Sequence, residues 1–234
     1  MKRVVEPELL DVLPWDDPQA LRSRADLRRV NVLMNNSKVL AAYLRAYVPL
    51  LARPQPHLRL VEIGAGDGTV LLAVAKRLRC FGTTAEVVLI DNQPVFADAT
   101  RDAFASIGWR VRQVVADVLE DLEPAFAHAD AVMANMFLHQ FEDVQLRRLF
   151  AQLCRKTSLV VAVEPRRSRP VMMAGGLLWL LGCSAVTRHD GEVSIRAGFR
   201  EQEMSALWHD PQSWDLVEGP ANLFNHGFVA RRKA

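Results

Sequence analysis

The stretch LVEIGAGDGTVLLAVAKRL, residues 60–78, decides the fold because three glycines separate two different apolar patterns. Before the glycines, residues 58–63 form a short β-rich run, and after them apolar residues recur at helical spacing. A strand that enters a glycine turn and leaves as a helix presents free N–H groups and a positive helix end to a ligand. The stretch therefore predicts a ligand site at the turn that contains Gly64, Gly66 and Gly68.

The alternation of strand and helix patterns continues along the chain and predicts the fold class. The predicted strands are residues 58–63, 85–90, 110–116, 129–135, 158–163, 214–218 and 223–231. The predicted helices between them are residues 68–79, 94–107 and 142–155. Continuous apolar strands that alternate with helices indicate a parallel sheet covered on both faces. We therefore expect an α/β fold, a doubly wound and mostly parallel seven-stranded sheet whose last two strands form a hairpin and leave one strand antiparallel.

Two further apolar patterns, in residues 19–51 and 171–186, predict how the rest of the chain is organised. Residues 19–51 indicate two helices, so we assign residues 1–56 to an N-terminal helical cap and residues 57–234 to the ligand-binding domain. The uncharged run VMMAGGLLWLLGCSAV, residues 171–186, is too short to span a bilayer, and we interpret it as a buried helix near a pocket. The segment after it, from residue 187, has an irregular pattern. The N-terminus lacks the apolar core of a signal peptide, and we expect a cytoplasmic protein without stable membrane insertion.

Composition argues against several classes of protein. The net charge is only +2, without a long run of like charge, so nucleic acid is not an expected partner. The three cysteines, Cys80, Cys154 and Cys183, are far apart and predict neither a disulfide framework nor a zinc site. We expect no metal. The oligomeric state is open, and a homodimer is a possible assembly.

The glycine pattern restricts which nucleotide-like ligand the turn can hold. Thr69 replaces the third glycine of a dinucleotide fingerprint, and no Gly-Lys-Ser/Thr follows as in a phosphate-binding loop. Glu62 precedes the first glycine, where a carboxylate suits an ammonium group. Asp91 follows the second strand, where a carboxylate can accept hydrogen bonds from ribose hydroxyls. Asp117, after the third strand, is placed to face an adenine edge.

Four motifs together resemble class I S-adenosylmethionine-dependent methyltransferases. They are VEIGAGDG, the acid in LIDNQP, ADV, and DAVMANMFLHQFED, in matching order and spacing over residues 58–165. The resemblance implies a Rossmann-like methyltransferase fold with S-adenosylmethionine as cofactor. It implies the following cofactor contacts: Glu62, Gly64 and Gly66 at the aminocarboxypropyl arm, Asp91 and Asn92 at the ribose, Asp117 and Val118 at the adenine, and Asn135 and Met136 under the sulfonium.

The sequence defines the acceptor site less closely than the cofactor site. A phenol needs a base of near-neutral pKa, which histidine supplies, and the candidates are His139, after the fourth strand, and His189, next to Asp190. His139 is equally readable as a histidine bonded to backbone at a helix entry, and His189 as part of a solvated loop, so the choice stays open. The candidate substrate contacts around the fifth strand and beyond it are Glu164, Arg166 and Arg188.

The expected activity follows from the resemblance and from what the motifs lack. The stretch from EPRRSR to SIRAGF also resembles small bacterial methyltransferases of polyketide and phenolic-lipid pathways. The Asn/Asp-Pro-Pro-aromatic signature of base-methylating enzymes and a carboxylate cluster for a metal are both missing. We therefore expect O-methylation of an apolar or aromatic small molecule, a phenolic or polyketide-type acceptor of secondary metabolism. The alternatives are C- or N-methylation of a similar acceptor, or a non-catalytic cofactor-binding scaffold.

Overall fold

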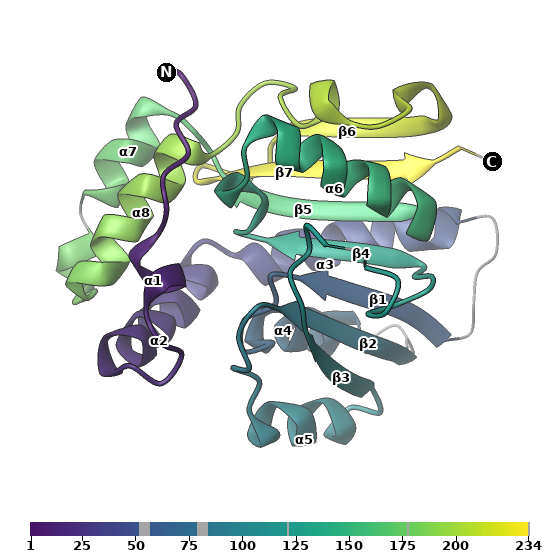
Figure 1. The fold of residues 1–234 in the computed structure, drawn as a ribbon, viewed down its shortest axis with the longest axis horizontal. Helices are drawn as coiled ribbons and strands as arrows, with labels where there is room; N and C mark the ends of the chain where they lie inside the picture. The colour runs from purple at the N-terminus through teal and green to yellow at the C-terminus, as the bar shows by residue number, and fades with distance from the viewer. Residues whose placement is uncertain (52–56, 79–83, 121, 177, 234) are drawn as a thin grey trace.

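A seven-stranded sheet organises the molecule (Figure 1). The computed structural model describes residues 1–51, 57–78, 84–120, 122–176 and 178–233. The strands are β1 (His57–Ile63), β2 (Thr84–Asp91), β3 (Arg110–Val115), β4 (Ala131–Asn135), β5 (Leu159–Pro165), β6 (Trp214–Pro220) and β7 (Asn225–Arg232). Their order in the sheet is β3-β2-β1-β4-β5-β7-β6, and only β7 runs antiparallel to its neighbours. The predicted doubly wound, mostly parallel sheet is confirmed.

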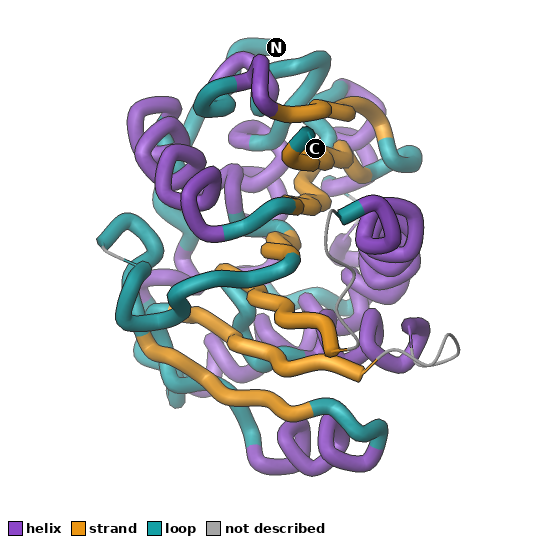
Figure 2. The backbone as a smooth tube through the Cα atoms, turned by 90° about the vertical axis from the view of Figure 1, so that its right-hand side faces the viewer, coloured by secondary structure: helices purple, strands orange, loops and turns teal. Residues whose placement is uncertain are grey.

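Helices cover both faces of this sheet (Figure 2). The helices are α1 (Leu9–Val12), α2 (Pro18–Leu33), α3 (Asn36–Tyr47), α4 (Thr69–Leu78), α5 (Asp98–Ser106), α6 (Asp143–Lys156), α7 (Arg169–Gly175) and α8 (Ala185–Ala197). One apolar core packs α3, α4 and α5 against the sheet through Leu40, Leu71 and Phe104. The other packs α6 through Leu149 and Phe150. The strands are buried on both sides, which explains their continuous apolar sequences.

The N-terminal segment divides between two parts of the structure. Helix α3 packs on α4 and β5, within the sandwich, whereas α1 and α2 pack on α8 (Figure 1). Asp26 of α2 accepts hydrogen bonds from the backbone of Ser184 and the hydroxyl of Thr187 at the start of α8. Helices α1, α2, α7 and α8 thus lie together at one end of the sheet. The boundary that we expected at residue 56 lies outside the described residues.

Residues 171–186 differ from the single buried helix that we predicted. Helix α7 ends at Gly175, a short 3₁₀-helix η4 (Leu178–Leu181) follows, and α8 begins at Ala185. The side chains of Met173, Trp179 and Leu180 are exposed. Two adjacent glycines end α7, and the Ser184 side chain then caps α8 by accepting a hydrogen bond from the backbone of Thr187. No described helix is long and apolar enough to cross a membrane.

Two other local predictions need correction. The helix expected from residue 94 begins at Asp98, because residues 92–95 form a turn in which Gln93 donates to Asp91. The segment after residue 187, which looked irregular, is the helix α8. Its residues alternate polar and apolar groups without a clear stripe, but Val186, Val193 and Ile195 are buried in the folded protein.

Candidate active site

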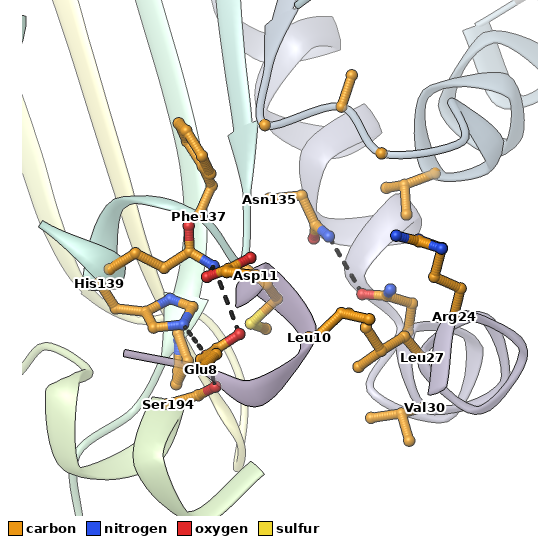
Figure 3. A pocket seen from close by; sticks show the side chains of 18 of the residues that line it. Glu8, Leu10, Asp11, Arg24, Leu27, Val30, Asn135, Phe137, His139 and Ser194 are labelled. Carbon is orange, nitrogen blue, oxygen red and sulfur yellow. Dashed lines mark hydrogen bonds and ion pairs between the residues drawn. The ribbon is translucent and has the colours of Figure 1, made fainter. Parts of the chain in front are cut away.

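A cavity of about 820 Å³ lies at the carboxyl ends of the parallel strands. One wall is formed by the turn after β1 and by the ends of β2, β3 and β4. The opposite wall comes from α1, α2, α7 and α8 (Figure 3). Because β1 has its sequence neighbour β2 on one side and β4 on the other, the cavity lies where the strand order reverses, the usual ligand site of such sheets.

The structure brings together every residue that the resemblance placed at the cofactor. All of them line this one cavity: Glu62, Gly64, Gly66, Asp91, Asn92, Asp117, Val118, Asn135 and Met136. They come from four strand ends that are distant in sequence and adjacent in the sheet. The arrangement follows from the parallel topology, since all four strands point the same way.

The glycines of the turn serve different purposes. A Cβ at Gly64 would lie 2.1 Å from the Phe137 ring, and a Cβ at Gly68 would lie 2.7 Å from Leu89, so both glycines permit close packing. A Cβ at Gly66 would meet nothing within 4 Å. Gly66 has a φ of +52°, which favours glycine, and it lines the cavity. The open space beside Gly66 is therefore available to a ligand.

Asp91 connects the end of β2 to the glycine turn. Its Oδ2 accepts a hydrogen bond of 2.8 Å from the Gly66 nitrogen, and its Oδ1 accepts one of 3.0 Å from the Gln93 nitrogen. Burial raises the pKa of the carboxyl group, against the lowering effect of these two bonds. A carboxylate has about four acceptor positions, so Asp91 retains capacity for hydroxyl donors in the cavity.

Glu62 is a buried carboxyl group that forms no ion pair with the described residues. It is 1% exposed, and its Oε2 has no hydrogen-bond partner among the described residues. Burial raises its pKa well above the ordinary value, and the nearby charges of Asp67 and Asp91 raise it further. A cationic group of a ligand in the cavity would reverse this shift, because it would stabilise the carboxylate.

A network of asparagines joins the end of β4 to the N-terminal helices. The Asn135 Oδ1 accepts from Asn36 at 2.9 Å. The Asn135 amide nitrogen, whose hydrogen bond is drawn in Figure 3, donates to Asn31 at 3.1 Å. Asn36 also accepts a bond of 2.7 Å from Asn225 at the start of β7. The next residue, Met136, has a φ of +50°, an uncommon value for a side chain with a Cβ. The network therefore holds the strand end in a defined conformation beside the cavity.

His139 lies between two carboxylates in the wall of the cavity. Its Nδ1 is 2.8 Å from Glu164. Its Nε2 is 3.1 Å from Glu8 (Figure 3). Burial by itself would lower the pKa of His139, but the hydrogen bonds and charges of Glu164 and Glu8 raise it to about 9. His139 is therefore an imidazolium at neutral pH and has no free nitrogen with which to accept a proton.

We had predicted that Glu164 contacts the substrate, but Glu164 does not line the cavity. It is fully buried behind the cavity wall, where Oε1 accepts from the backbone nitrogens of Phe137 and Leu138 at 3.1 and 2.9 Å. Its other oxygen binds His139. All of its interactions hold the loop that follows β4. Its role is thus to position that loop.

His189, Arg166 and Arg188 also lie away from the cavity lining. His189 is half exposed on α8, and its Nδ1 is 3.0 Å from Asp190. Both oxygens of Asp190 accept backbone N–H groups at the start of α1, from Leu9 and Leu10. The His189–Asp190 pair therefore supports α1 and does not present a base to a ligand. Arg166 is half-buried just after β5, and Arg188 is exposed on α8. Neither lines the cavity.

Several cavity residues escaped the sequence analysis because they belong to the N-terminal segment. Asp11, Arg24 and Asn31 line the cavity together with Glu8. Although Asp11 is exposed to solvent at the edge of the cavity, reduced hydration there raises its pKa to about 7, and repulsion from Glu8 and Asp190 adds to this effect. The charged pattern of residues 6–11 was the only sequence signal, and it resembles that of any exposed N-terminus.

Comparison with known proteins relates the chain to methyltransferases. Residues 60–158 match a family model described as a methyltransferase domain. Residues 60–158 are therefore similar to a methyltransferase domain. The match covers the glycine turn, Asp91, Asp117 and Asn135, which all line the cavity. A comparison with curated proteins finds no match.

Solved methyltransferases share the fold at low sequence identity. The plantazolicin methyltransferase BpumL in complex with SAH is 14% identical, with a TM-score of 0.67, over 94% of this chain and 92% of that one. An O-methyltransferase family protein from Burkholderia thailandensis is 18% identical, with a TM-score of 0.62, over 94% and 61%. The mitomycin 7-O-methyltransferase MmcR is 17% identical, with a TM-score of 0.57, over 92% and 58%. At these identities the likeness concerns the fold of the methyltransferase.

Proposed function

We propose that this methyltransferase binds S-adenosylmethionine along the strand ends and O-methylates a small apolar or aromatic acceptor. The acceptor would be a phenolic or polyketide-type molecule of secondary metabolism. Support comes from one observation above all: the acids and glycines at the strand ends face a helical wall that contributes many apolar side chains beside a few polar ones. The solved O-methyltransferases of similar fold agree with the proposal.

The residues at the strand ends fit the cofactor. When bound, S-adenosylmethionine supplies an activated methyl group on a positively charged sulfur. Gly66 leaves open space for the ligand's approach, and Glu62 has an unpartnered oxygen that suits an ammonium group. Asp91 has acceptor capacity for ribose hydroxyls, and Asn92, Asp117 and Val118 would surround the base. Asn135 and Met136 would lie near the transferable methyl group.

The helical wall fits an apolar acceptor. Its lining side chains are Leu10, Leu27, Val30, Leu33, Val171, Leu178, Leu181 and Ile195. They come from the N-terminal segment and from α7, η4 and α8, which lie between β5 and β6 in the chain. We propose that residues 1–56 act as the cap over this part of the cavity, with α3 as its anchor in the sandwich.

Proton removal from a hydroxyl acceptor needs a group that is unprotonated near neutral pH. His139 is charged there and is held by Glu8 and Glu164. Asp11 lines the same part of the cavity, its pKa is about 7, and its Oδ2 accepts a 3.0 Å bond from Gln140. We propose that Asp11 accepts the proton and that His139 positions Glu8 beside it.

Two measurements test the proposal in order. Calorimetry with S-adenosylhomocysteine tests the cofactor site without any acceptor. A screen of phenols, amines and enolisable polyketide analogues with methyl-labelled S-adenosylmethionine then tests the acceptor class. We expect binding, followed by transfer to a hydroxyl oxygen. Transfer only to nitrogen or carbon would replace O-methylation by the alternative chemistry, and binding without any transfer would favour the non-catalytic scaffold.

A further inference from the structure

Exposed apolar side chains gather around the mouth of the cavity. Most of the large apolar side chains that are exposed in the described chain belong to α1, α2, α7 and η4 or to the turn before α2. Met173 is 77% exposed and Trp179 is 56% exposed. Leu33 and Leu181 both line the cavity and are exposed, so the apolar wall continues onto the outer surface. Extended apolar patches of this kind mark interaction sites.

The patch is built from two segments that lie side by side. Arg29 of α2 donates to the Leu181 carbonyl oxygen of η4, with a distance of 3.5 Å. Asp26 binds the start of α8, as described above. We call the surface formed by residues 18–34 and 169–188, without residue 177, the mouth surface. It includes the exposed parts of α2, α7 and η4.

The mouth surface carries more positive than negative charge. It contains six arginines and one acidic residue, Asp26, and the turn before α2 adds the acids Asp16 and Asp17 at its edge. Asp26 is buried and pairs with Arg29. Four of these arginines make no ion pair within the described part of the chain: Arg24, which lines the cavity and donates to Gln93, and Arg22, Arg169 and Arg188. The same segments therefore carry both arginines without an ion pair and exposed tryptophan, leucine and methionine side chains.

We propose that the mouth surface docks onto an anionic lipid surface. Tryptophan and leucine side chains can enter the boundary between headgroups and acyl chains, while arginines contact the headgroups. A second copy of this chain fits less well, because a two-fold interface would bring the same arginines together and their charges would repel. The cavity of the docked protein would face the lipid, and this benefit rests on the apolar acceptor of the proposed function, which the lipid would concentrate.

Vesicle co-sedimentation tests the proposal independently of methyl transfer. The vesicles contain either phosphatidylcholine alone or phosphatidylcholine mixed with phosphatidylglycerol. We expect binding to the mixed vesicles, weaker binding at high salt, and little binding to phosphatidylcholine alone. Each of the changes Arg22→Gln and Arg188→Gln should weaken binding about fivefold, from roughly 1 kcal/mol for each arginine near the surface. Trp179→Ser with Leu180→Ser should weaken it by about tenfold or more.

Matched controls distinguish the mouth surface from a general effect of surface changes. Val144→Ser on α6 and Val217→Ser on β6 alter exposed side chains outside it and should leave vesicle binding unchanged. S-adenosylhomocysteine affinity should be equal in all variants, which separates this proposal from the cofactor site. Equal binding of wild type and both sets of mouth variants would overturn the proposal. Self-association that is lost in the Trp179 variant, without vesicle binding, would also overturn it in favour of an interface between copies.

Discussion

Asp91 and Gly66 are 25 positions apart in sequence and are joined by a 2.8 Å hydrogen bond from the Gly66 nitrogen to the Asp91 carboxylate. The bond connects the end of β2 with the turn after β1. The bond is possible because β1 and β2 are parallel neighbours. Ile63, three residues before Gly66, pairs with Ile90, the residue before Asp91. The acid and the turn therefore act as one unit in the wall of the cavity.

Asp91→Ala should lower the affinity for S-adenosylhomocysteine by about 1.5–3 kcal/mol, because it removes charge-assisted hydrogen bonds. Isothermal titration calorimetry measures the change. Asp98→Ala, which alters an exposed acid on α5, is the matched control and should bind normally. Unchanged affinity in the Asp91 variant would refute the ribose role of this residue.

Gly66→Val and Gly64→Val should have different effects. A valine at Gly66 points into open space of the cavity, so it should abolish S-adenosylhomocysteine binding, while its positive φ should lower stability by about 1–3 kcal/mol without a steric clash. A valine at Gly64 would collide with the Phe137 ring and should lower the melting temperature strongly. Fluorescence titration and thermal unfolding distinguish the two. Normal binding by a folded Gly66 variant would make the turn purely structural.

The pH dependence of kcat/KM tests Asp11 as the proton acceptor. Its carboxylate form must be present, so the rate should rise with pH through about 7 and then level off. Asp11→Asn should remove this rise and lower kcat by roughly 10² with cofactor affinity unchanged. If His139 were the base, the rise would be centred near pH 9 in wild type and absent in His139→Ala. His189→Ala is the control and should resemble wild type.

The contacts of His139 with Glu8 and Glu164 should make the free energy of unfolding depend on pH in the alkaline range. The folded pKa of about 9 is higher than the ordinary value of 6.5, so the fold favours the protonated ring. This contribution is fully present below about pH 6.5 and is lost as the pH rises through about 9. The melting temperature of wild type should therefore fall over this range relative to that of His139→Gln. Glu8→Gln should reduce the same difference, and parallel curves for wild type and His139→Gln would contradict the assignment.

Local sequence determined the sheet and the cofactor side of the cavity. The glycine turn between β1 and α4 is a strand pattern followed directly by a helix pattern, and both patterns depend on neighbours within a few residues. Once the strands are parallel, their carboxyl ends must meet at one edge, so Asp91, Asp117 and Asn135 converge whatever the loops between them do. These positions could be predicted from order and spacing.

The choice among histidines depended on tertiary contacts. His139 and His189 both stand near acids in sequence or in the predicted topology, yet only His139 lines the cavity. The acid beside His189 supports the backbone of α1, and the acid that binds His139 Nε2 is Glu8, 131 positions away. Sequence neighbours do not report which way a side chain points from a helix, so no local pattern could separate the two.

The exposure of residues 171–186 was likewise decided by the folded structure. Their apolar composition by itself is compatible with a buried helix, and we predicted one. The glycines at 175 and 176 divide the segment, and α2 covers only one side of it, through Asp26 and Arg29. The sequence alone determined which residues are apolar and which strands converge. Only the tertiary structure decided which apolar residues are covered, because burial depends on segments that are distant along the chain.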